Sequence, residues 1–389
     1  MFTYKKVEEI EEIAEMAFFS FGVKHDKQKP FKKYLSKLLE SNVELFGAYD
    51  GEKPVAGYLL YPFEMRIRED MVPMGGLGLV CSRPDYRGKG AVKFMLKEAI
   101  KTMIKKNMKV SVLYPFNIDF YRKYGWELFF TRKIITLSPG QLKKSSVEGV
   151  EAIYYRYPDE EIKEFYNKKA KTFYNFALRD DYIWHRHLDN EISGSASEGV
   201  VKFVKNGQIV GIFTLQISSE DFGSKASVGS VVYNNEEVKR AMFDYLRKLS
   251  HQVSKLEIWV SEDFLIWPYL SDRPSSIKKR YAGMMRVNSM NLLDGLKIGD
   301  EKIDFTVSIK DKTNEENEGT WELRNNECVL SVTKSSESPD LETDIGTFSS
   351  IMSGFTDFSE MIRANRVKVL NSDSEFNLKK TTTFHFESF

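Results

Sequence analysis

The sequence predicts a mixed α/β protein that contains two similar modules and a third, acidic α+β region. Two observations indicate the modules: hairpin signals recur at Asp50-Gly51 and Asn206-Gly207, and the order hairpin, strand, helix, strand occurs twice. A chain of 389 residues with 42% apolar residues can supply more than one core. We therefore expect domains at 1–150, 151–285 and 286–389.

The first module begins with two amphipathic helices and continues as a meander followed by strand, helix and strand. "VEEIEEIAEMAFF" places apolar residues at helical spacing, and alternating apolar runs bounded by turn residues indicate strands. In chain order we expect helices at 7–19 and 31–42, a hairpin over 43–67, a strand at 74–82, a helix at 91–107, a strand at 109–116, a short helix at 117–125 and a strand at 126–137.

The second module repeats this order, and the third region is built differently. The expected elements of the second module are a helix at 159–173, a hairpin over 199–217, a strand and helix over 229–250, and a strand at 255–261. In the third region we expect short strands at 302–309, 319–325 and 327–332, a helical segment at 341–362 and a strand-like tail at 381–389.

Composition excludes several classes of protein. The net charge is +1, and basic residues are interspersed with acidic ones, so we expect no nucleic-acid partner. Cys81 and Cys328 are the only cysteines, which excludes a disulfide framework and a thiol metal cluster. The charged start "MFTYKKVEEIEEIAEM" does not read as a secretory signal, and no apolar run is long enough for a membrane span. We expect a cytoplasmic protein without a membrane partner or a metal.

The stretch "SRPDYRGKGAVKFML", residues 82–96, carries the clearest chemical signal. Arg87-Gly88-Lys89-Gly90 lies between a predicted strand and a predicted helix, where backbone N–H groups and the helix dipole favour an anion. The two cations can add charge-assisted hydrogen bonds to phosphate. The pattern lacks the glycine spacing of a dinucleotide fingerprint and the Gly-Lys-Ser/Thr of a Walker loop. A pyrophosphate is the expected anion, and a chance surface turn is the alternative.

A second motif, "YPFNIDFYRKYGWE", follows about thirty residues later. Asn117 can offer its amide to another amide, and Tyr121 lies on the short predicted helix. A phenol beside a thioester can give a proton to a departing thiolate. The alternative is that Tyr121 is an ordinary core residue.

Together, "LVCSRPDYRGKGAVKFML" and "NIDFYRKYGWE" resemble the acetyl-CoA signature of the GNAT N-acetyltransferases. The whole chain resembles the Eis-like branch, whose members have a GNAT domain, a degenerate GNAT-like domain and a sterol-carrier-like C-terminal domain. The resemblance implies tandem GNAT folds, each with a largely antiparallel central sheet flanked by helices. It also implies acetyl-CoA as co-substrate and assembly as a hexamer.

The resemblance assigns roles residue by residue. Backbone groups of Val80, Cys81 and Ser82 would pair with the pantetheine arm, Asn117 would steady that arm, and Tyr121 would be the general acid. The pyrophosphate cradle would consist of Arg87, Gly88, Lys89, Gly90 and Ala91. One departure is Val92, where the family often has a glycine or another small residue.

In this branch the general base is the chain's own terminal carboxylate, which here belongs to Phe389. An α-carboxyl titrates near ~3.5, and burial would raise that pKa toward a useful value. Phe384 and Phe386 could supply the apolar surroundings. The alternative is a frayed terminus.

Other candidate residues have weaker support. Phe18, Phe21 and Trp184 are candidate walls of the acceptor pocket by the same resemblance, and core packing is the alternative for each. His185 and His187, with Asp181 or Asp189, could suggest a metal, but their spacing matches no ligand pattern.

The expected activity is acetyl transfer from acetyl-CoA to a primary amine: an aminoglycoside, a polyamine or a lysine side chain. One alternative is a non-catalytic lipid or small-ligand carrier built on a GNAT scaffold. Another is a tandem-GNAT peptidyl transferase that takes aminoacyl-tRNA, but the sequence contains no long helical arm of the kind such enzymes carry.

Overall fold

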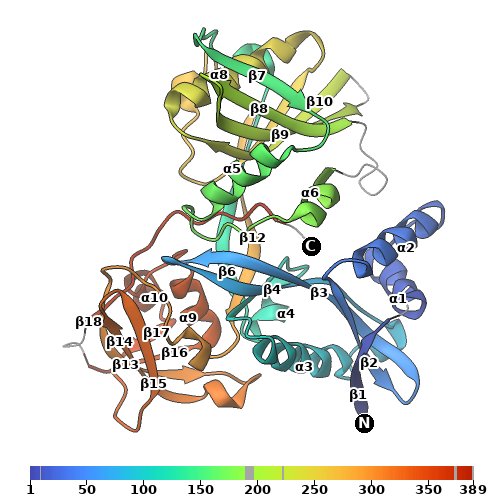
Figure 1. The fold of residues 1–389 in the computed structure, drawn as a ribbon. Coiled ribbons are helices and arrows are strands. Elements are labelled where there is room, and N and C mark those ends of the chain that lie inside the picture. The colour runs from blue at the N-terminus through green and yellow to red at the C-terminus, as the bar shows by residue number, and fades with distance from the viewer. Residues whose placement is uncertain (9, 189–196, 221–222, 372–374, 388–389) are drawn as a thin grey trace. The chain divides into compact units, whose positions relative to one another are not determined.

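The computed structural model describes all residues except 9, 189–196, 221–222, 372–374 and 388–389, and leaves out the side chains of residues 12, 185–188, 197 and 375. The chain divides into two compact units (Figure 1). Unit 1 contains residues 1–130, 282–383 and 387–389, and unit 2 contains residues 131–281 and 384–386. The predicted boundaries at residues 150 and 285 stay a prediction.

The N-terminal part of unit 1 is a meander with helices inserted at three points. Its elements are β1 (Phe2–Val7), α1 (Glu11–Phe21), α2 (His25–Leu39), β2 (Glu44–Asp50), β3 (Lys53–Ile67), β4 (Asp70–Ser82), α3 (Ala91–Lys105), β5 (Val110–Leu113), α4 (Ile118–Arg122) and the start of β6 (Glu127–Leu137). Strands β1 to β4 pair antiparallel in chain order, and β4 pairs parallel with β5 after the α3 crossover.

Unit 2 repeats this arrangement. Its elements are β7 (Val150–Tyr155), α5 (Glu160–Ala170), α6 (Asp181–Leu188), β8 (Ser197–Lys205), β9 (Gln208–Glu220), β10 (Gly223–Tyr233), α8 (Glu236–Lys248), β11 (Lys255–Val260) and the start of β12 (Ser276–Val287). Strands β7 to β10 pair antiparallel and β10 pairs parallel with β11, as β1 to β5 do.

The strands β6 and β12 each continue from one unit into the other. The end of β6 pairs with β11 in unit 2, and the end of β12 pairs with β5 in unit 1. Each module therefore completes its sheet with a strand that belongs, by chain order, to the other one.

The C-terminal part of unit 1 forms a second sheet with two short helices. Its elements are β13 (Lys302–Lys310), β14 (Gly319–Asn326), β15 (Val329–Lys334), β16 (Leu341–Asp344), α9 (Ile345–Met352), α10 (Phe358–Arg363), β17 (Val367–Val369) and β18 (Glu375–Asn377). The strand order is β15-β14-β13-β16-β17, and β18 pairs with β13. The predicted fold class, a mixed α/β chain with tandem modules and a C-terminal α+β region, is confirmed.

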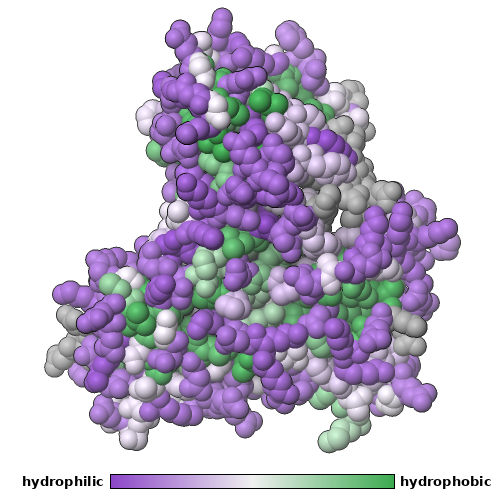
Figure 2. Space-filling view, viewed as in Figure 1, coloured by the Kyte–Doolittle hydropathy of each residue, from purple (hydrophilic) through white to green (hydrophobic). Residues whose placement is uncertain are grey.

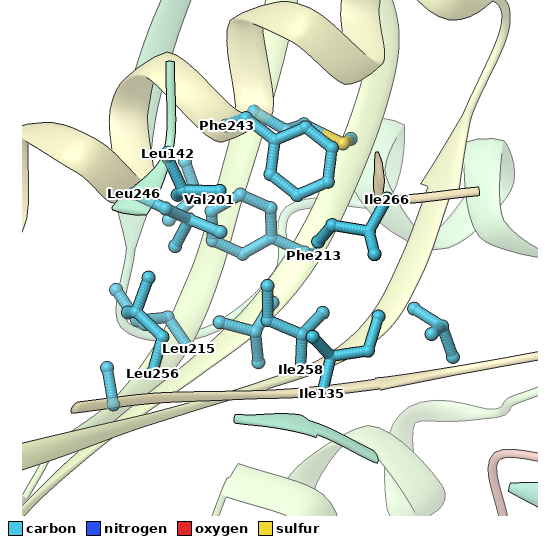
Figure 3. Close-up of a cluster of buried hydrophobic side chains, with 14 of the residues drawn as sticks. Ile135, Leu142, Val201, Phe213, Leu215, Phe243, Leu246, Leu256, Ile258 and Ile266 are labelled. Carbon is cyan, nitrogen blue, oxygen red and sulfur yellow. The ribbon is translucent and has the colours of Figure 1, made fainter. Parts of the chain in front are cut away.

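In each module, apolar residues at helical spacing on one helix pack against the sheet and form the core. In α3 the buried residues include Met95, Ala99 and Met103, each four apart, and they pack on the sheet of unit 1. In unit 2, Figure 3 shows Phe243 and Leu246 of α8 beside Val201 and Phe213 of the strands. Hydrophilic residues cover most of the face of each unit seen in Figure 2.

Three predicted elements are wrong. The segment expected to be helical over 341–362 begins with the strand β16, because its first residues pair with β13 and β17. The helix expected from Val7 starts only at Glu11, because Phe2–Val7 pairs with β2 and turns Phe2 and Tyr4 toward the apolar cluster below α3. The strand-like tail forms no strand over its described residues 381–387. That segment is nevertheless packed, since Phe384 is 3% exposed and Glu387 is fully buried.

Among the described residues, no helix combines the length and the apolar character that crossing a membrane requires.

Candidate active site

The end of β4 offers backbone groups that its neighbour β5 leaves open. The parallel ladder between these strands runs from Met74 to Leu77 and ends there, while β4 continues to Ser82. Beyond this ladder β4 contains a bulge. Leu79 has a φ of 53°, and the pairing of β4 with β3 shifts register between Gly57 and Leu59. An extended amide-bearing chain can pair with such an exposed strand edge, as a peptide does in strand addition.

The turn after β4 leads directly into the N-terminus of α3. Gly88 and Gly90 have φ values of 77° and 85°, which only glycine adopts without strain. Gly90 precedes the helix, and no side chain caps its first turn. The N–H groups of that turn therefore lie exposed beside the positive end of the helix dipole, which is a ready site for an anion.

The two cations of the turn are exposed and lie over aromatic rings. The Arg87 guanidinium is 5.5 Å from the ring centre of Phe19, and the Lys89 ammonium is 4.7 Å from that of Tyr86. Tyr86 is itself fixed by a 2.8 Å hydrogen bond that its hydroxyl donates to Asp50. These aromatic contacts limit the side-chain freedom of both cations, so less entropy is lost when they bind phosphate.

The thiol of Cys81 is separate from this chemistry. The side chain is 3% exposed and lies 3.6 Å from the Gly57 carbonyl oxygen. Burial raises the pKa of the Cys81 thiol to about 12, so it is not a nucleophile at ordinary pH. Only its backbone is available for the predicted role.

Asn117 begins the short helix α4. Its side-chain oxygen accepts a 2.9 Å hydrogen bond from the Phe120 N–H and so caps the helix. The exposed side chain still has its amide N–H groups to donate.

Tyr121 lies on α4 among aromatic rings. Its ring is 5.4 Å from Phe116, 5.1 Å from Phe120 and 6.3 Å from Trp126, and each pair meets edge to face. The residue is 2% exposed, and burial raises the pKa of the Tyr121 phenol well above its usual range. The phenol thus keeps its proton at neutral pH, as an acid or a hydrogen-bond donor must.

The tail of the chain reaches the end of β5. The Tyr114 hydroxyl donates a hydrogen bond to the backbone carbonyl of Glu387. Tyr114 follows β5 immediately and precedes Asn117 by three residues, so the tail is fixed near the start of α4. Phe389 lies outside the described residues. Sequence analysis missed Tyr114, although its position at the end of a strand within the second motif was a usable signal.

The predicted pocket residues fall in different environments. Phe18 is 9% exposed, whereas Phe21 is 55% exposed. Phe18 also borders a groove of about 620 Å³ between α1 and α2, which is lined by Glu15, Phe18, Phe19, His25, Gln28, Lys29 and Lys32. Trp184 in unit 2 is 1% exposed, and its ring lies 4.5 Å from the Arg179 guanidinium.

The metal alternative is not supported by the described residues. Within them no group of three or more His, Cys, Asp or Glu side chains is arranged to hold an ion. The side chains of His185 and His187, and all of Asp189, lie outside the described part of the chain.

The second module keeps the bulge and lacks the anion turn. Strand β10 shifts register between Gly229 and Val232, with Ser230 at a φ of 46°, as β4 does at Leu79. Helix α8 follows β10 after only two residues, and the Asn235 side chain accepts a hydrogen bond from the Val238 N–H. That cap uses an N–H group of the kind that α3 leaves without a side-chain partner, so the uncapped glycine turn is a feature of the first module and not of the second.

Comparisons with known proteins agree with this geometry. Residues 3–129 match the acetyltransferase (GNAT) domain family, and residues 291–384 match the sterol carrier protein domain family. A comparison with curated proteins found no significant match.

Solved structures match along the entire chain. A probable N-acyltransferase from Enterococcus faecalis has a TM-score of 0.87 at 20% identity, and a GCN5-related N-acetyltransferase from Anabaena variabilis has 0.87 at 16%. Eis1 from Mycobacterium abscessus has a TM-score of 0.78 at 14% identity. In all three comparisons 100% of each chain is covered, so the fold is shared from end to end.

The open β4 edge, the glycine turn before α3 and the matched domain models lead to one conclusion: residues 3–129 form a GNAT acetyltransferase domain of an acetyl-CoA-dependent enzyme, residues 291–384 form a sterol carrier protein domain, and the whole chain shares the fold of the Eis1 structure.

Proposed function

We propose that the enzyme transfers the acetyl group of acetyl-CoA to a primary amine, with Tyr121 as general acid and the terminal carboxylate of Phe389 as general base. The observation that supports this proposal is that the helix carrying Tyr121 and the described part of the tail are both linked to the end of β5. Tyr121 follows that strand on α4, and Glu387 is bound there by Tyr114.

The residues of the first module fit the donor substrate. The β4 edge at Val80, Cys81 and Ser82 would pair with the pantetheine amides, and the Asn117 amide would donate to the same arm. The turn from Arg87 to Ala91 would hold the pyrophosphate. Acetyl-CoA supplies an acetyl group activated as a thioester.

The proposed acid and the proposed base account for the two proton transfers of the reaction. The attacking amine must lose a proton, which the terminal carboxylate would accept directly or through a water molecule. The departing sulfur needs a proton, or a strong hydrogen bond, which the neutral Tyr121 phenol would supply. Holding both reactants in one geometry supplies much of the acceleration in such a reaction.

The reach of the tail supports the carboxylate assignment. Two residues follow Glu387, and a fully extended dipeptide spans about 7 Å. The Glu387 carbonyl is bound by Tyr114, so two further residues would give the proposed base a short reach from the end of β5. The described part of the tail is buried rather than frayed, as the exposures of Phe384 and Glu387 show.

The carrier alternative is less well supported. A non-catalytic scaffold has no need for an uncapped helix preceded by two glycines at positive φ, yet the first module has both. The nature of the amine (aminoglycoside, polyamine or lysine side chain), the hexameric assembly and the cytoplasmic location stay predictions from the resemblance.

The proposal is tested by measuring release of CoA thiol with a panel of aminoglycosides, polyamines and lysine peptides. We expect Tyr121→Phe to lower kcat by about a hundredfold or more, because general acids contribute on that scale. The matched control is Tyr124→Phe, which removes the hydroxyl group of a tyrosine two residues after α4. This variant should keep a kcat near that of the wild type. Equal loss in both variants would refute the acid assignment.

The base is tested by adding one glycine after Phe389, which moves the terminal carboxylate and retains the phenyl ring. Loss of turnover in this variant and in a variant lacking Phe389 supports the carboxylate. Full turnover in the extended enzyme would refute it. If acetyl-CoA binds and no amine of the panel is acetylated, the proposed acceptor class is wrong.

A further inference from the structure

The helix that carries Tyr121 is too short to fix its own position. Helix α4 has five residues, so it makes little more than one turn of backbone hydrogen bonds. A helix of this length is not stable by itself, and its position must come from tertiary contacts. Asn117 caps its start, and the contacts at its end come from residues far along the chain.

One such contact is made by Arg286 on β12. This side chain is fully buried, and its Nη1 donates a 2.8 Å hydrogen bond to the carbonyl of Tyr124, just after α4. Its guanidinium lies 5.7 Å from the ring centre of Trp126, which in turn packs against Tyr121. The chain accommodates this approach only because residue 125 is glycine: a Cβ there would lie 1.8 Å from Nη1.

The C-terminal region holds Arg286 in place. Its Nη2 forms an ion pair with Asp311, which follows β13 and is also buried. Asp311 is oriented by a 2.9 Å hydrogen bond from the Asn317 side chain and a 3.0 Å bond from the Thr313 N–H. The carboxylate therefore has a fixed direction, and so does the guanidinium that it binds.

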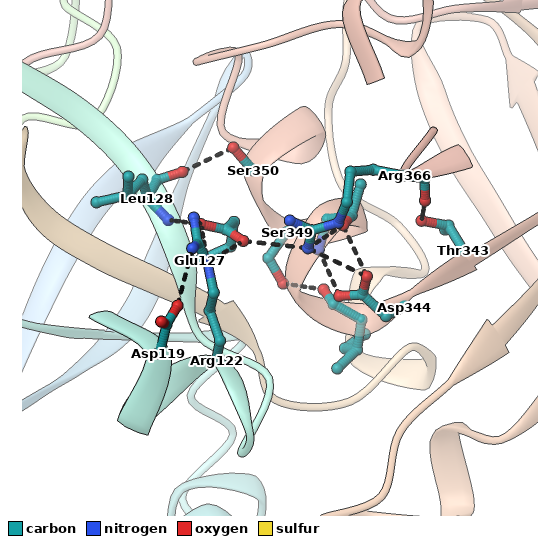
Figure 4. A network of polar contacts seen from close by, with 11 residues as sticks. Asp119, Arg122, Glu127, Leu128, Thr343, Asp344, Ser349, Ser350 and Arg366 are labelled. Atoms are coloured by element: carbon teal, nitrogen blue, oxygen red, sulfur yellow. Dashed lines mark hydrogen bonds and ion pairs between the residues drawn. The ribbon is translucent and has the colours of Figure 1, made fainter. Parts of the chain in front are cut away.

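A second contact reaches α4 through Glu127 (Figure 4). Arg122, the last residue of α4, donates 2.9 Å hydrogen bonds from Nε and Nη2 to the two oxygens of this carboxylate. Arg366 of the C-terminal region donates to Glu127 from the other direction at 3.2 Å. Arg366 is itself held by Thr347 at 2.8 Å and by Asp344 at 3.3 Å.

We propose that the sterol-carrier-like region positions the catalytic tyrosine, by holding α4 through Arg286 on one side and through the Arg366–Glu127–Arg122 network on the other. The region would then serve the transfer reaction through the position of α4. This inference rests on the proposed role of Tyr121, and Arg286 and Arg366 are positioning residues that act through α4.

Arg366→Met is the test variant, because this side chain is partly exposed and its loss leaves the Arg122–Glu127 pair intact. Arg324→Met is the matched control: it removes an arginine of the same region that pairs with Asp304 and Glu322 of its own sheet. Both variants are made in the wild-type enzyme and in Tyr121→Phe. The measurements are kcat, the Kd of acetyl-CoA and the midpoint of thermal unfolding.

We expect Arg366→Met to lower kcat between about tenfold and about a hundredfold, because small misplacements of a catalytic group have effects of this size. The Kd of acetyl-CoA should stay unchanged, and Arg366→Lys should recover part of the activity. In Tyr121→Phe the same substitution should have almost no further effect, because the group that it positions is gone.

Two outcomes would overturn the inference: an unchanged kcat in Arg366→Met, or the same fold loss with and without the Tyr121 hydroxyl. Full activity of Tyr121→Phe alone would instead show that the proposed acid is wrong, and the inference would fall with it. If Arg366→Met does not fold, Asp344→Asn removes only one partner of Arg366 and carries the same test.

Discussion

Replacing Gly125 by alanine tests the close approach on which the end of α4 depends. Gly125 has a φ of 87°, and a Cβ at this position would lie 1.8 Å from Nη1 of Arg286 and 2.6 Å from Cγ2 of Ile345. Neither neighbour can give way easily, since Arg286 is buried and paired with Asp311 and Ile345 is 2% exposed.

The expected cost has three parts. A left-handed backbone costs a residue with a Cβ about 1–2 kcal/mol. Overpacking a filled site costs about 1–3 kcal/mol. Loss of the hydrogen bond from Arg286 to the Tyr124 carbonyl adds about 1 kcal/mol. We therefore expect Gly125→Ala to lower the free energy of unfolding by about 3–6 kcal/mol.

The control is Gly51→Ala. Gly51 has a φ of 62°, and a Cβ there would meet nothing within 4 Å, so this variant isolates the backbone cost of about 1–2 kcal/mol. Urea denaturation measures the loss of unfolding free energy in each variant, provided that the m-value is the same as in the wild type. Equal losses in the two variants would refute the steric argument. A loss of kcat only in Gly125→Ala would further link the site to the position of Tyr121.

The remaining predictions concern other parts of the molecule. Arg87→Ala and Lys89→Ala should each raise the KM for acetyl-CoA by about tenfold with little change in kcat, since in the proposed site each side chain would donate a charge-assisted hydrogen bond to phosphate. Steady-state kinetics checks this, and a fall in kcat at constant KM would contradict it. Burial raises the pKa of Glu198 from 4.5 to about 7, so the folded protein keeps a proton that the unfolded chain loses between these values. Stability should therefore fall as pH rises from about 4.5 to about 7, and Glu198→Gln should weaken this dependence in thermal unfolding measured against pH. Arg68, which is 1% exposed, donates hydrogen bonds to the carbonyls of Met352 and Lys379 at 2.9 and 2.7 Å. Arg68→Met should destabilise the protein by about 3–5 kcal/mol, and unchanged thermal unfolding would show that these contacts are dispensable.

Local patterns were enough to predict most elements and the glycine turn before α3. Helical spacing in α3, the hairpin signals and the glycine turn are properties of neighbouring residues, so they can be read without knowing what packs against them. The turn from Arg87 to Ala91 is a single continuous segment, and its left-handed glycines are required wherever that segment is placed. The cap that Asn117 forms on α4 was not predicted, although asparagine before a helix is a common cap signal.

Pairing and burial decided what the sequence left open. Phe2–Val7 looked like the approach to a helix, and it is a strand because β2 offers it a partner. The tail after Thr381 carried a strand-like pattern, and it packs without joining a ladder over its described residues. Neither outcome follows from propensity, because both depend on contacts with distant residues.

The position of Tyr121 is the clearest case of this division. The sequence alone predicted a short helix that carries this tyrosine. Only the tertiary structure placed Arg286, Asp311 and Arg366 at the end of that helix, from positions more than 160 residues away in the chain. The physical reason is that a five-residue helix has almost no stability of its own, so the side chains that hold it in place come from wherever the fold brings them.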